Sequence, residues 1–156
     1  MIQRPRTSVV YLALSASALV GITLNEGYSD HAIIPVPGDV PTIGFGTTGG
    51  VKMGDKTTPP KALARTLSDV QKDEGAIKKC VFVPLYQWEY DTYIDLSYNI
   101  GAGAFCRSEL VKKLNASDYA GACREILRWN RSGGRELPGL TNRRQTEYQK
   151  CIGGSA

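Results

Sequence analysis

Hydrophobic and polar positions divide the chain into three stretches with different patterns. Residues 9–24 read VVYLALSASALVGITL, a run without a charged side chain. Residues 35–60 are rich in Gly, Pro and Thr and carry β-type patches at Val40–Phe45 and Val51–Met53, which together indicate a small hairpin or meander. Beyond residue 60, apolar side chains recur at the spacing typical of helices.

The first of about five predicted helices follows the β-type stretch directly. Thr58 is expected to cap it, and the helix is predicted over residues 59–79. Four apolar side chains fall on one face at helical spacing: Leu63, Leu67, Val70 and Ile77.

Residues 84–152 are predicted to hold the remaining helices. The segment at the start of this range is apolar on most sides, which is typical of a central, buried helix. Ser108, Ser117 and Thr141 are each placed to begin a later helix, and the last should end near Ile152. One small β patch followed by several helices predicts an α+β fold that is mainly α.

Composition supports a single globular domain. The 156 residues are 42% hydrophobic and 22% charged, which suffices for a core and excludes disordered, collagen-like and coiled-coil chains. The net charge is +4, but residues 107–156 alone carry 10 basic and 5 acidic side chains, an excess of five. This basic part, which includes Arg143 and Arg144, is expected to attract an anionic partner such as nucleic acid, a membrane or a cell-wall polymer, or to be solvated surface.

Histidine and cysteine usage excludes several kinds of site. His31 is the one histidine, so neither a His-rich metal site nor a Ser or Cys triad with a histidine base is expected. No two cysteines form a Cys-x-x-Cys pair, which argues against zinc ribbons and thioredoxin-like sites. An even number suits two disulfides in an exported protein, among Cys80, Cys106, Cys123 and Cys151. No metal or organic cofactor is expected.

The N-terminus has the pattern of an export signal. Arg4 and Arg6 precede the apolar run, and a positive flank before an apolar stretch stays on the cytoplasmic side of the membrane. The run of 16 residues is short and is diluted by Ser, Gly and Thr, whereas a membrane span needs roughly 17–25 residues. Three interpretations stay open: a weak signal-anchor over residues 1–24, a signal peptide cleaved after Ala18, or an ordinary buried first helix.

Carboxylates carry the remaining candidate chemistry. Hydrolysis of a glycosidic bond needs a protonated carboxyl group as general acid and an ionised carboxylate that activates water or stabilises charge on the sugar. Glu26 follows the apolar run and suits the protonated role, because its neighbours are apolar. Asp30 and Asp39 are candidates for the ionised role, and Asp39 lies three residues before Thr42. Taken alone, such acids are more typical of solvated surface.

Four blocks of sequence, in this order, resemble the phage-type lysozymes (glycoside hydrolase family 24), the endolysins of tailed phages. The blocks are Glu26-Gly27, TIGFGTT at 42–48, YNIGAGAFCRSELVKKLN at 98–115 and GGRELPGLTNRR at 133–144. The resemblance implies a lysozyme-like catalytic domain over residues 25–156. In that fold a small β-hairpin lobe (35–58) and a helical lobe (84–152) are joined by a long helix (59–79), with the active-site cleft between them.

The resemblance also implies the reaction. Such an enzyme hydrolyses the β-1,4 bond between N-acetylmuramic acid and N-acetylglucosamine in peptidoglycan, with inversion, and acts as a monomer on this polymer rather than on nucleic acid. Glu26 matches the general acid, and Thr42 matches the residue that holds the attacking water. The family's aspartate is expected nine residues after the acid, where this chain has Pro35. Asp39 is therefore assigned as the second carboxylate, with Asp30 as the alternative.

Two further features follow from the resemblance. Some of these endolysins carry a weak signal-anchor that holds them inactive in the host inner membrane and later releases them to the periplasm, and residues 9–24 resemble such a segment. The family's helical lobe implies a disulfide between Cys123 and Cys151, which leaves Cys80 and Cys106 as the second pair. Two other functions remain open: a lytic transglycosylase, and a membrane-tethered peptidoglycan-binding module without enzymatic activity.

Overall fold

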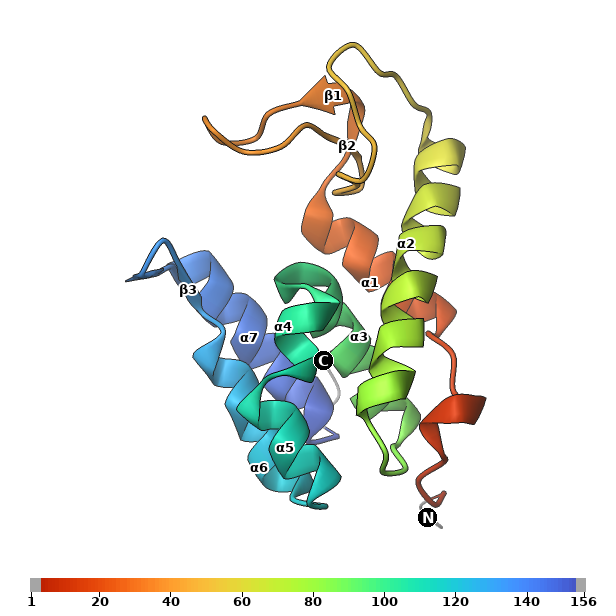
Figure 1. Ribbon diagram of the computed structural model, residues 1–156, viewed down its shortest axis with the longest axis vertical. Coiled ribbons are helices and arrows are strands. Elements are labelled where there is room, and N and C mark those ends of the chain that lie inside the picture. The colour runs from red at the N-terminus through yellow and green to blue at the C-terminus, as the bar shows by residue number, and fades with distance from the viewer. Residues whose placement is uncertain (1–3, 154–156) are drawn as a thin grey trace. The chain divides into compact units, whose positions relative to one another are not determined.

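The computed structural model describes residues 4–153 and consists mainly of helices with two small antiparallel sheets, so the predicted α+β, mainly α, class is confirmed (Figure 1). The chain divides into two compact units. Residues 16–72 form the first, called the small unit below. Among the described residues, 4–15 and 73–153 together form the second, called the helical unit.

The small unit contains a helix, a two-stranded sheet and the first part of a long helix. These are α1 (Ala16–Glu26), β1 (Ser29–Ile33), β2 (Thr42–Gly44) and the start of α2 (Pro59–Cys80). Strand β1 pairs antiparallel with β2, with Ser29 opposite Gly44 and Ile33 opposite Thr42. The register shifts between these two pairs, so β1 bulges.

The predicted hairpin partner was wrong. Strand β2 lies within the β-type patch Val40–Phe45, but it pairs with β1 and not with Val51–Met53. The stretch after β2 is made of turns, in which the Val51 N–H donates to the Thr48 carbonyl. The Lys52 N–H donates to the Asp55 carboxylate at 2.9 Å. These local bonds satisfy the backbone without a strand.

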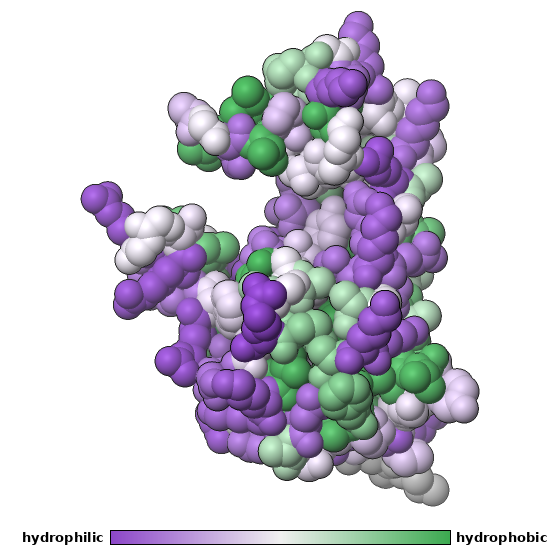
Figure 2. Space-filling view, in the orientation of Figure 1, coloured by the Kyte–Doolittle hydropathy of each residue, from purple (hydrophilic) through white to green (hydrophobic). Residues whose placement is uncertain are grey.

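Part of the small unit's surface is hydrophobic. The segment that joins β1 to β2 exposes aliphatic side chains, namely Ile33, Ile34, Val36 and Val40. In the space-filling view, hydrophobic residues accordingly reach the surface around this hairpin (Figure 2).

The helical unit contains the end of α2 and most of the other elements. They are the short 3-10 helices η1 (Val9–Tyr11) and η2 (Ile126–Arg128), the helices α3 (Gln87–Ile100), α4 (Ala102–Cys106), α5 (Glu109–Asn115), α6 (Tyr119–Glu125) and α7 (Pro138–Cys151), and a hairpin of β3 (Arg131–Ser132) and β4 (Arg135–Glu136). Helix α3 is the buried central helix that the sequence predicted, with most of its residues shielded from solvent.

Helix boundaries confirm some predicted caps and correct others. Helix α2 begins directly after Thr58, and Ser108 caps α5 by accepting from the Val111 N–H. Ser117 does not cap α6, because its neighbour Asp118 accepts from the Gly121 N–H at 2.8 Å. Thr141 does not begin α7 either. That helix starts three residues earlier, at Pro138, because proline suits the first turn, where its missing N–H is not needed.

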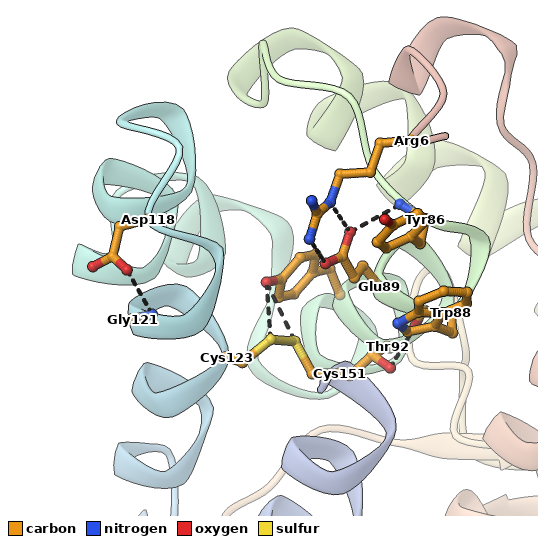
Figure 3. Close-up of a disulfide and its surroundings, with 10 residues drawn as sticks. Arg6, Tyr86, Trp88, Glu89, Thr92, Asp118, Gly121, Cys123 and Cys151 are labelled. Carbon is orange, nitrogen blue, oxygen red and sulfur yellow. Dashed lines mark hydrogen bonds and ion pairs between the residues drawn. A yellow bond between two sulfur atoms is a disulfide. The ribbon is translucent and has the colours of Figure 1, made fainter. Parts of the chain in front are cut away.

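Both predicted disulfides are confirmed. Cys80 at the end of α2 pairs with Cys106 at the end of α4, and Cys123 in α6 pairs with Cys151 at the end of α7. Each closes a loop between residues 26 or 28 positions apart, for which loop-closure entropy predicts a stabilisation of about 3.5 kcal/mol. The second disulfide lies beside α3 (Figure 3), where the Cys151 Sγ is 3.4 Å from the hydroxyl oxygen of Tyr93.

The apolar run at residues 9–24 is divided between elements. It forms η1, an irregular link and most of the 11-residue helix α1. Within residues 4–153, no helix combines the length and the apolar character needed to cross a bilayer. Ile22 is the buried residue of α1, whereas Val20 and Leu24 are 56% and 79% exposed.

Candidate active site

Glu26, the predicted acid, is the last residue of α1 and is half-buried. Gly27 follows with a φ of +69°, a left-handed conformation that ends the helix. The Glu26 side chain lies against the backbone of Gly46. A methyl group added to Gly46 would stand 3.0 Å from the Glu26 Oε2 and 3.3 Å from its Cγ. This close approach and the left-handed φ of Gly46, +81°, both favour glycine beside the Glu26 carboxylate.

The TIGFGTT block forms the tight turn that brings Gly46 to this position. Ile43 and Thr47 exchange two backbone hydrogen bonds, of 2.9 and 3.1 Å. Thr47 is buried, and its hydroxyl donates to the Asp69 carboxylate at 3.2 Å. Gly44 has a φ of +63°, and a methyl group there would meet the Ala62 side chain of α2 at 2.8 Å. Both glycines are thus needed for close approach.

Thr42, the predicted water-holding residue, begins β2 and lies on the same strand-and-turn as Gly46. Its hydroxyl donates to the Val40 carbonyl at 3.2 Å. That bond uses the hydroxyl proton and leaves oxygen lone pairs, which can accept a hydrogen bond from a water molecule.

The two candidate aspartates have different surroundings. Asp39 is exposed in the segment between β1 and β2, and its Oδ1 accepts from the Val40 N–H at 2.9 Å. Asp30, in β1, lies 2.6 Å from the His31 Nδ1. This hydrogen bond lowers the pKa of Asp30 below its ordinary value. Asp30 thus has a charged or polar side-chain partner of its own, whereas the carboxylate of Asp39 is held by backbone alone.

The small unit therefore brings Glu26 beside the turn after β2, with Thr42 at the start of that strand and Asp39 three residues before it. Gly46 was not singled out as a site residue from the sequence, although the Gly-x-Gly spacing after Thr42 was a signal for it. In the part of the chain that the structure describes, no cluster of three or more His, Cys, Asp or Glu side chains could hold a metal ion.

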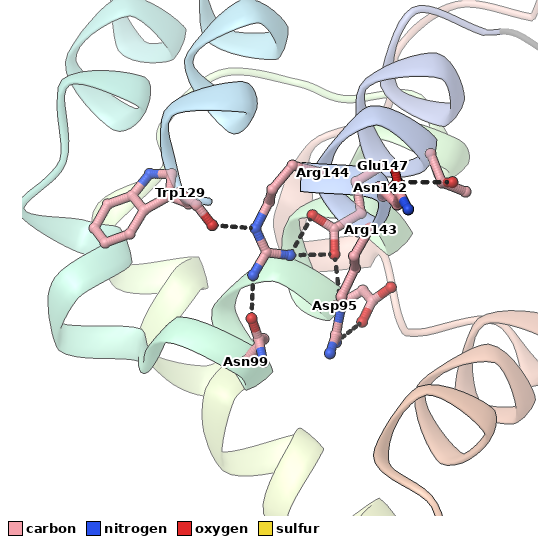
Figure 4. A network of polar contacts seen from close by, with 8 residues as sticks. Asp95, Asn99, Trp129, Asn142, Arg143, Arg144 and Glu147 are labelled. Carbon is pink, nitrogen blue, oxygen red and sulfur yellow. Dashed lines mark hydrogen bonds and ion pairs between the residues drawn. The ribbon is translucent and has the colours of Figure 1, made fainter. Parts of the chain in front are cut away.

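Two further sequence blocks that resemble the phage-type lysozymes, residues 98–115 and 133–144, contribute to one buried polar network in the helical unit (Figure 4). Arg144 is 1% exposed, so the expectation of an exposed or partner-facing arginine is wrong for this residue. Its guanidinium donates twice to Glu147, at 2.6 and 2.7 Å, and also to the Trp129 carbonyl and the Asn99 amide oxygen. Asn99 belongs to the block at 98–115 and Arg144 to that at 133–144, so the network joins both.

Arg143 and Asp95 extend this network. The Arg143 guanidinium donates to Asp95 at 2.9 Å and to Glu147 at 3.2 Å. Burial raises the pKa of Glu147 above its ordinary value, and the positive charge of Arg144 opposes that shift. Because the carboxylate is buried, its two arginine partners are needed to keep it ionised at low cost.

Comparison with known proteins agrees with this arrangement. The phage lysozyme family matches residues 23–147. A SAR-endolysin of Pseudomonas phage phiKMV is 35% identical over 144 residues, which cover 90% of this chain and 89% of the relative. The structure of the endolysin from Escherichia coli O157:H7 phage FAHEc1 superposes with a TM-score of 0.80 at 33% identity, covering 91% of this chain and 94% of that one. A mutant of P22 lysozyme gives 0.78 at 31% identity, covering 90% and 99%.

The matched residues contain Glu26, the whole β1–β2 hairpin with its turn, and the arginines of the buried network. The solved relatives share the mainly helical fold with small sheets. The chain therefore belongs to the phage lysozyme family and is a lysozyme-type glycoside hydrolase, an endolysin that hydrolyses peptidoglycan and lyses the host cell.

Proposed function

We propose that Glu26, Asp39 and Thr42 carry out the hydrolysis of the β-1,4 bond between N-acetylmuramic acid and N-acetylglucosamine. Glu26 donates a proton to the leaving sugar oxygen, Asp39 acts as the ionised carboxylate, and Thr42 accepts a hydrogen bond from the attacking water. All three groups come from the small unit of one chain, so we propose that the enzyme acts as a monomer.

The contact between Glu26 and Gly46 carries this proposal. A general acid must hold its proton in a fixed place, and Glu26, the last residue of α1, lies against a turn in which the left-handed φ of Gly46 favours glycine. Asp39 supports the assignment because its carboxylate has no ion-pair partner among residues 4–153 and is available to a developing positive charge. Asp30 already faces His31.

Three single variants of the full chain test the assignment. Glu26→Gln should lower the rate of peptidoglycan hydrolysis about 10²–10⁴-fold without changing the thermal midpoint, because the amide cannot donate the proton. Asp39→Asn should lower the rate strongly and Asp30→Asn only slightly. The release of reducing ends from purified peptidoglycan measures the rate. A damaging Asp30→Asn together with a mild Asp39→Asn would exchange the roles of the two aspartates.

Analysis of the products distinguishes hydrolysis from the reaction of a lytic transglycosylase. Hydrolysis yields reducing N-acetylmuramic acid ends, whereas a lytic transglycosylase yields anhydro-sugar ends, which mass spectrometry distinguishes. Reducing ends that disappear with Glu26→Gln support the hydrolase.

We propose that residues 1–24 form a signal-anchor that is retained after export, first in the inner membrane and then in the periplasm. Two observations support this. Several large apolar side chains of the segment are not needed for the core, since Val10, Tyr11, Val20 and Leu24 are all exposed. Two relatives that each match about nine-tenths of this chain, from Pseudomonas phage phiKMV and Enterobacteria phage P21, are SAR-endolysins.

Retention is favoured over cleavage after Ala18 by the contacts of residues 7–15 within the helical unit. Thr7 and Leu85 exchange two backbone hydrogen bonds of 2.8 Å. The Leu14 N–H donates to Glu74 at 2.7 Å, and both the N–H and the hydroxyl of Ser15 donate to Asp91. Cleavage would break all of these hydrogen bonds and leave Glu74, which is 8% exposed, without the Leu14 N–H.

Intact-mass measurement on fractionated cells tests retention. The expected result is one full-length mass in both the membrane and the periplasmic fractions. A periplasmic form that begins at Leu19 would show cleavage after Ala18 and would contradict the proposal.

A further inference from the structure

Arg6, in the N-terminal segment, forms an ion pair with a buried carboxylate of the helical unit. Arg6 donates from Nε and Nη2 to the two carboxylate oxygens of Glu89, at 3.0 and 2.7 Å (Figure 3). The Glu89 side chain is 4% exposed, so its charge is shielded from water and depends on this partner. The Glu89 carboxylate also accepts from the Tyr86 N–H at 2.8 Å, which holds it at the start of α3.

Two tyrosine rings complete the site. The Arg6 guanidinium carbon lies 3.6 Å from the centre of the Tyr119 ring and 4.3 Å from that of Tyr86. The Tyr86 ring also stacks on the ring of Trp88, with centroids 4.3 Å apart and an interplanar angle of 18°. The Tyr119 hydroxyl donates to the Pro84 carbonyl at 2.9 Å, which fixes that ring. A flat cation between two aromatic faces and a bidentate carboxylate match the geometry of arginine and not that of lysine.

Arg4 provides a contrast two positions earlier. It is exposed, and no ion pair or hydrogen bond joins it to the other residues that the structure describes. Both arginines belong to the positive flank that precedes the apolar run. In an anchored chain such a flank stays on the cytoplasmic side, and each charge resists passage through the bilayer.

From this contrast we infer that Glu89, Tyr86 and Tyr119 form a docking site for Arg6. The inference rests on the retained signal-anchor proposed above. Arg6 must then move from the cytoplasmic side to the periplasm before the released enzyme can form this ion pair. Arg4 and Arg6 then have unequal roles. Both charges oppose release, but only Arg6 gains a charged partner in the folded enzyme, which offsets the cost of moving its charge across the bilayer. The same arginine thus helps to hold the anchored chain and stabilises the released one.

Variants of the full chain separate these roles. In purified protein, Arg6→Gln should lower the thermal midpoint by about 5–10 °C, because Glu89 stays buried without its counter-charge. Arg6→Lys keeps the charge but loses the fork and the stacking, and should lower the midpoint by about half as much. Arg4→Gln removes a charge from the same flank and should leave the midpoint unchanged.

Glu89→Gln distinguishes a specific pair from general packing. The amide still accepts from the Tyr86 N–H, and the double variant Arg6→Gln with Glu89→Gln leaves no buried charge unpaired. The double variant should therefore recover at least half of the midpoint lost in Arg6→Gln alone. Equal midpoints for Arg6→Gln and Arg4→Gln, or additive losses in the double variant, would overturn the docking site.

Release is measured as the periplasmic fraction of full-length chain in fractionated cells. Arg6→Gln should lower that fraction roughly tenfold relative to Arg4→Gln, since it loses the docked state. Equal fractions for the two variants would overturn the role in release. If the wild-type chain never fractionates with the membrane, the signal-anchor proposal fails, and the thermal midpoints still decide whether the docking site exists.

Discussion

The helical unit and the small unit hold their charged residues in opposite ways. In the helical unit, Glu89, Arg144 and Glu147 are almost fully buried, and each has two or more hydrogen-bond partners. Glu89 and Arg144 each have a partner far away in the chain, whereas Glu147 pairs with two arginines of its own helix. In the small unit, Asp30 and Asp39 are exposed and contact only their own neighbours. In the small unit it is the backbone that is fixed, because Gly44 and Gly46 adopt left-handed conformations in the turn after Thr42.

Because of this difference, we expect the helical unit to determine mainly the stability of the protein and the small unit mainly its catalytic activity. A buried ion pair is costly to break, so substitutions in the helical network should act mainly on the free energy of unfolding. Exposed carboxylates cost little to replace, so substitutions in the small unit should act mainly on the rate of hydrolysis. Four experiments test whether the helical unit governs stability and the small unit governs the rate of hydrolysis.

The largest effect is expected for Arg144→Met, which leaves Glu147 buried with one arginine fewer. We expect a loss of about 3–5 kcal/mol in the free energy of unfolding, measured by urea denaturation at pH 7. Arg128→Met is the control, because that side chain is 72% exposed and should cost less than about 0.5 kcal/mol. Similar losses for both variants would show that burial of the network does not govern stability.

The next effect concerns the disulfide between α6 and α7. Replacing Cys123 and Cys151 together by serine should lower the free energy of unfolding by about 3.5 kcal/mol, because the denatured chain regains the freedom of a 28-residue separation. Adding a thiol reductant to wild-type protein should give a loss at least as large, since it also opens the Cys80–Cys106 bond. A double variant as stable as the wild type would contradict this prediction.

Gly46→Ala should act on catalysis in the small unit. The added methyl group meets Glu26 Oε2 at 3.0 Å, so we expect at least a tenfold loss of hydrolysis, equivalent to about 1.4 kcal/mol. Gly54→Ala is the matched control, because Gly54 also has a left-handed φ, of +97°, but has no atom within 4 Å of the added methyl. Both variants should cost about 1–2 kcal/mol of stability through strain. Equal activities would remove Gly46 from the positioning of Glu26.

The smallest effect is a pH dependence in the helical unit. Hydrogen bonds from Lys113, and then from Arg128, lower the pKa of Glu125 below its ordinary value. A carboxyl with a lowered folded pKa stabilises the protein above the unfolded pKa, near about 4.3, and loses that contribution as the pH falls through the folded pKa. The midpoint difference between wild type and Glu125→Gln should therefore be greatest near pH 7 and should shrink at acidic pH. Because Arg128 is exposed, the contribution should stay below about 1 kcal/mol. A difference that grows on acidification would have the wrong sign.

Sequence patterns predicted the start of α2 directly after Thr58 and the cap of α5 at Ser108. The apolar face predicted for α2 was correct only in part, because Val70 and Ile77 are buried, whereas the side chains of Leu63 and Leu67 are exposed. Sequence patterns failed where two capping residues compete, as Ser117 does with Asp118, because both can accept a hydrogen bond from the first turn. Strand β1 was missed because only Ala32 in SDHAI is buried, so the strand lacks the alternation that marks one.

The candidate site was predicted only in part, for a physical reason. Glu26 and Thr42 came from motifs, but the closeness of Gly46 to Glu26 depends on a turn that joins residues 20 positions apart. The burial of Arg144 could not be predicted, since an arginine on a polar helix is usually exposed, and its partners lie as far as Asn99. Neither feature has a local pattern.

If residues 9–24 pass from lipid to water, the residues of helix α1 must suit both environments. Its one buried residue, Ile22, and its terminal Glu26 are what the folded enzyme uses, whereas Val20 and Leu24 face water. The hydropathy of the exposed positions can therefore drift in evolution with little cost to the folded enzyme. Related phages could adjust how firmly the chain is held in the bilayer by changing side chains that catalysis does not need.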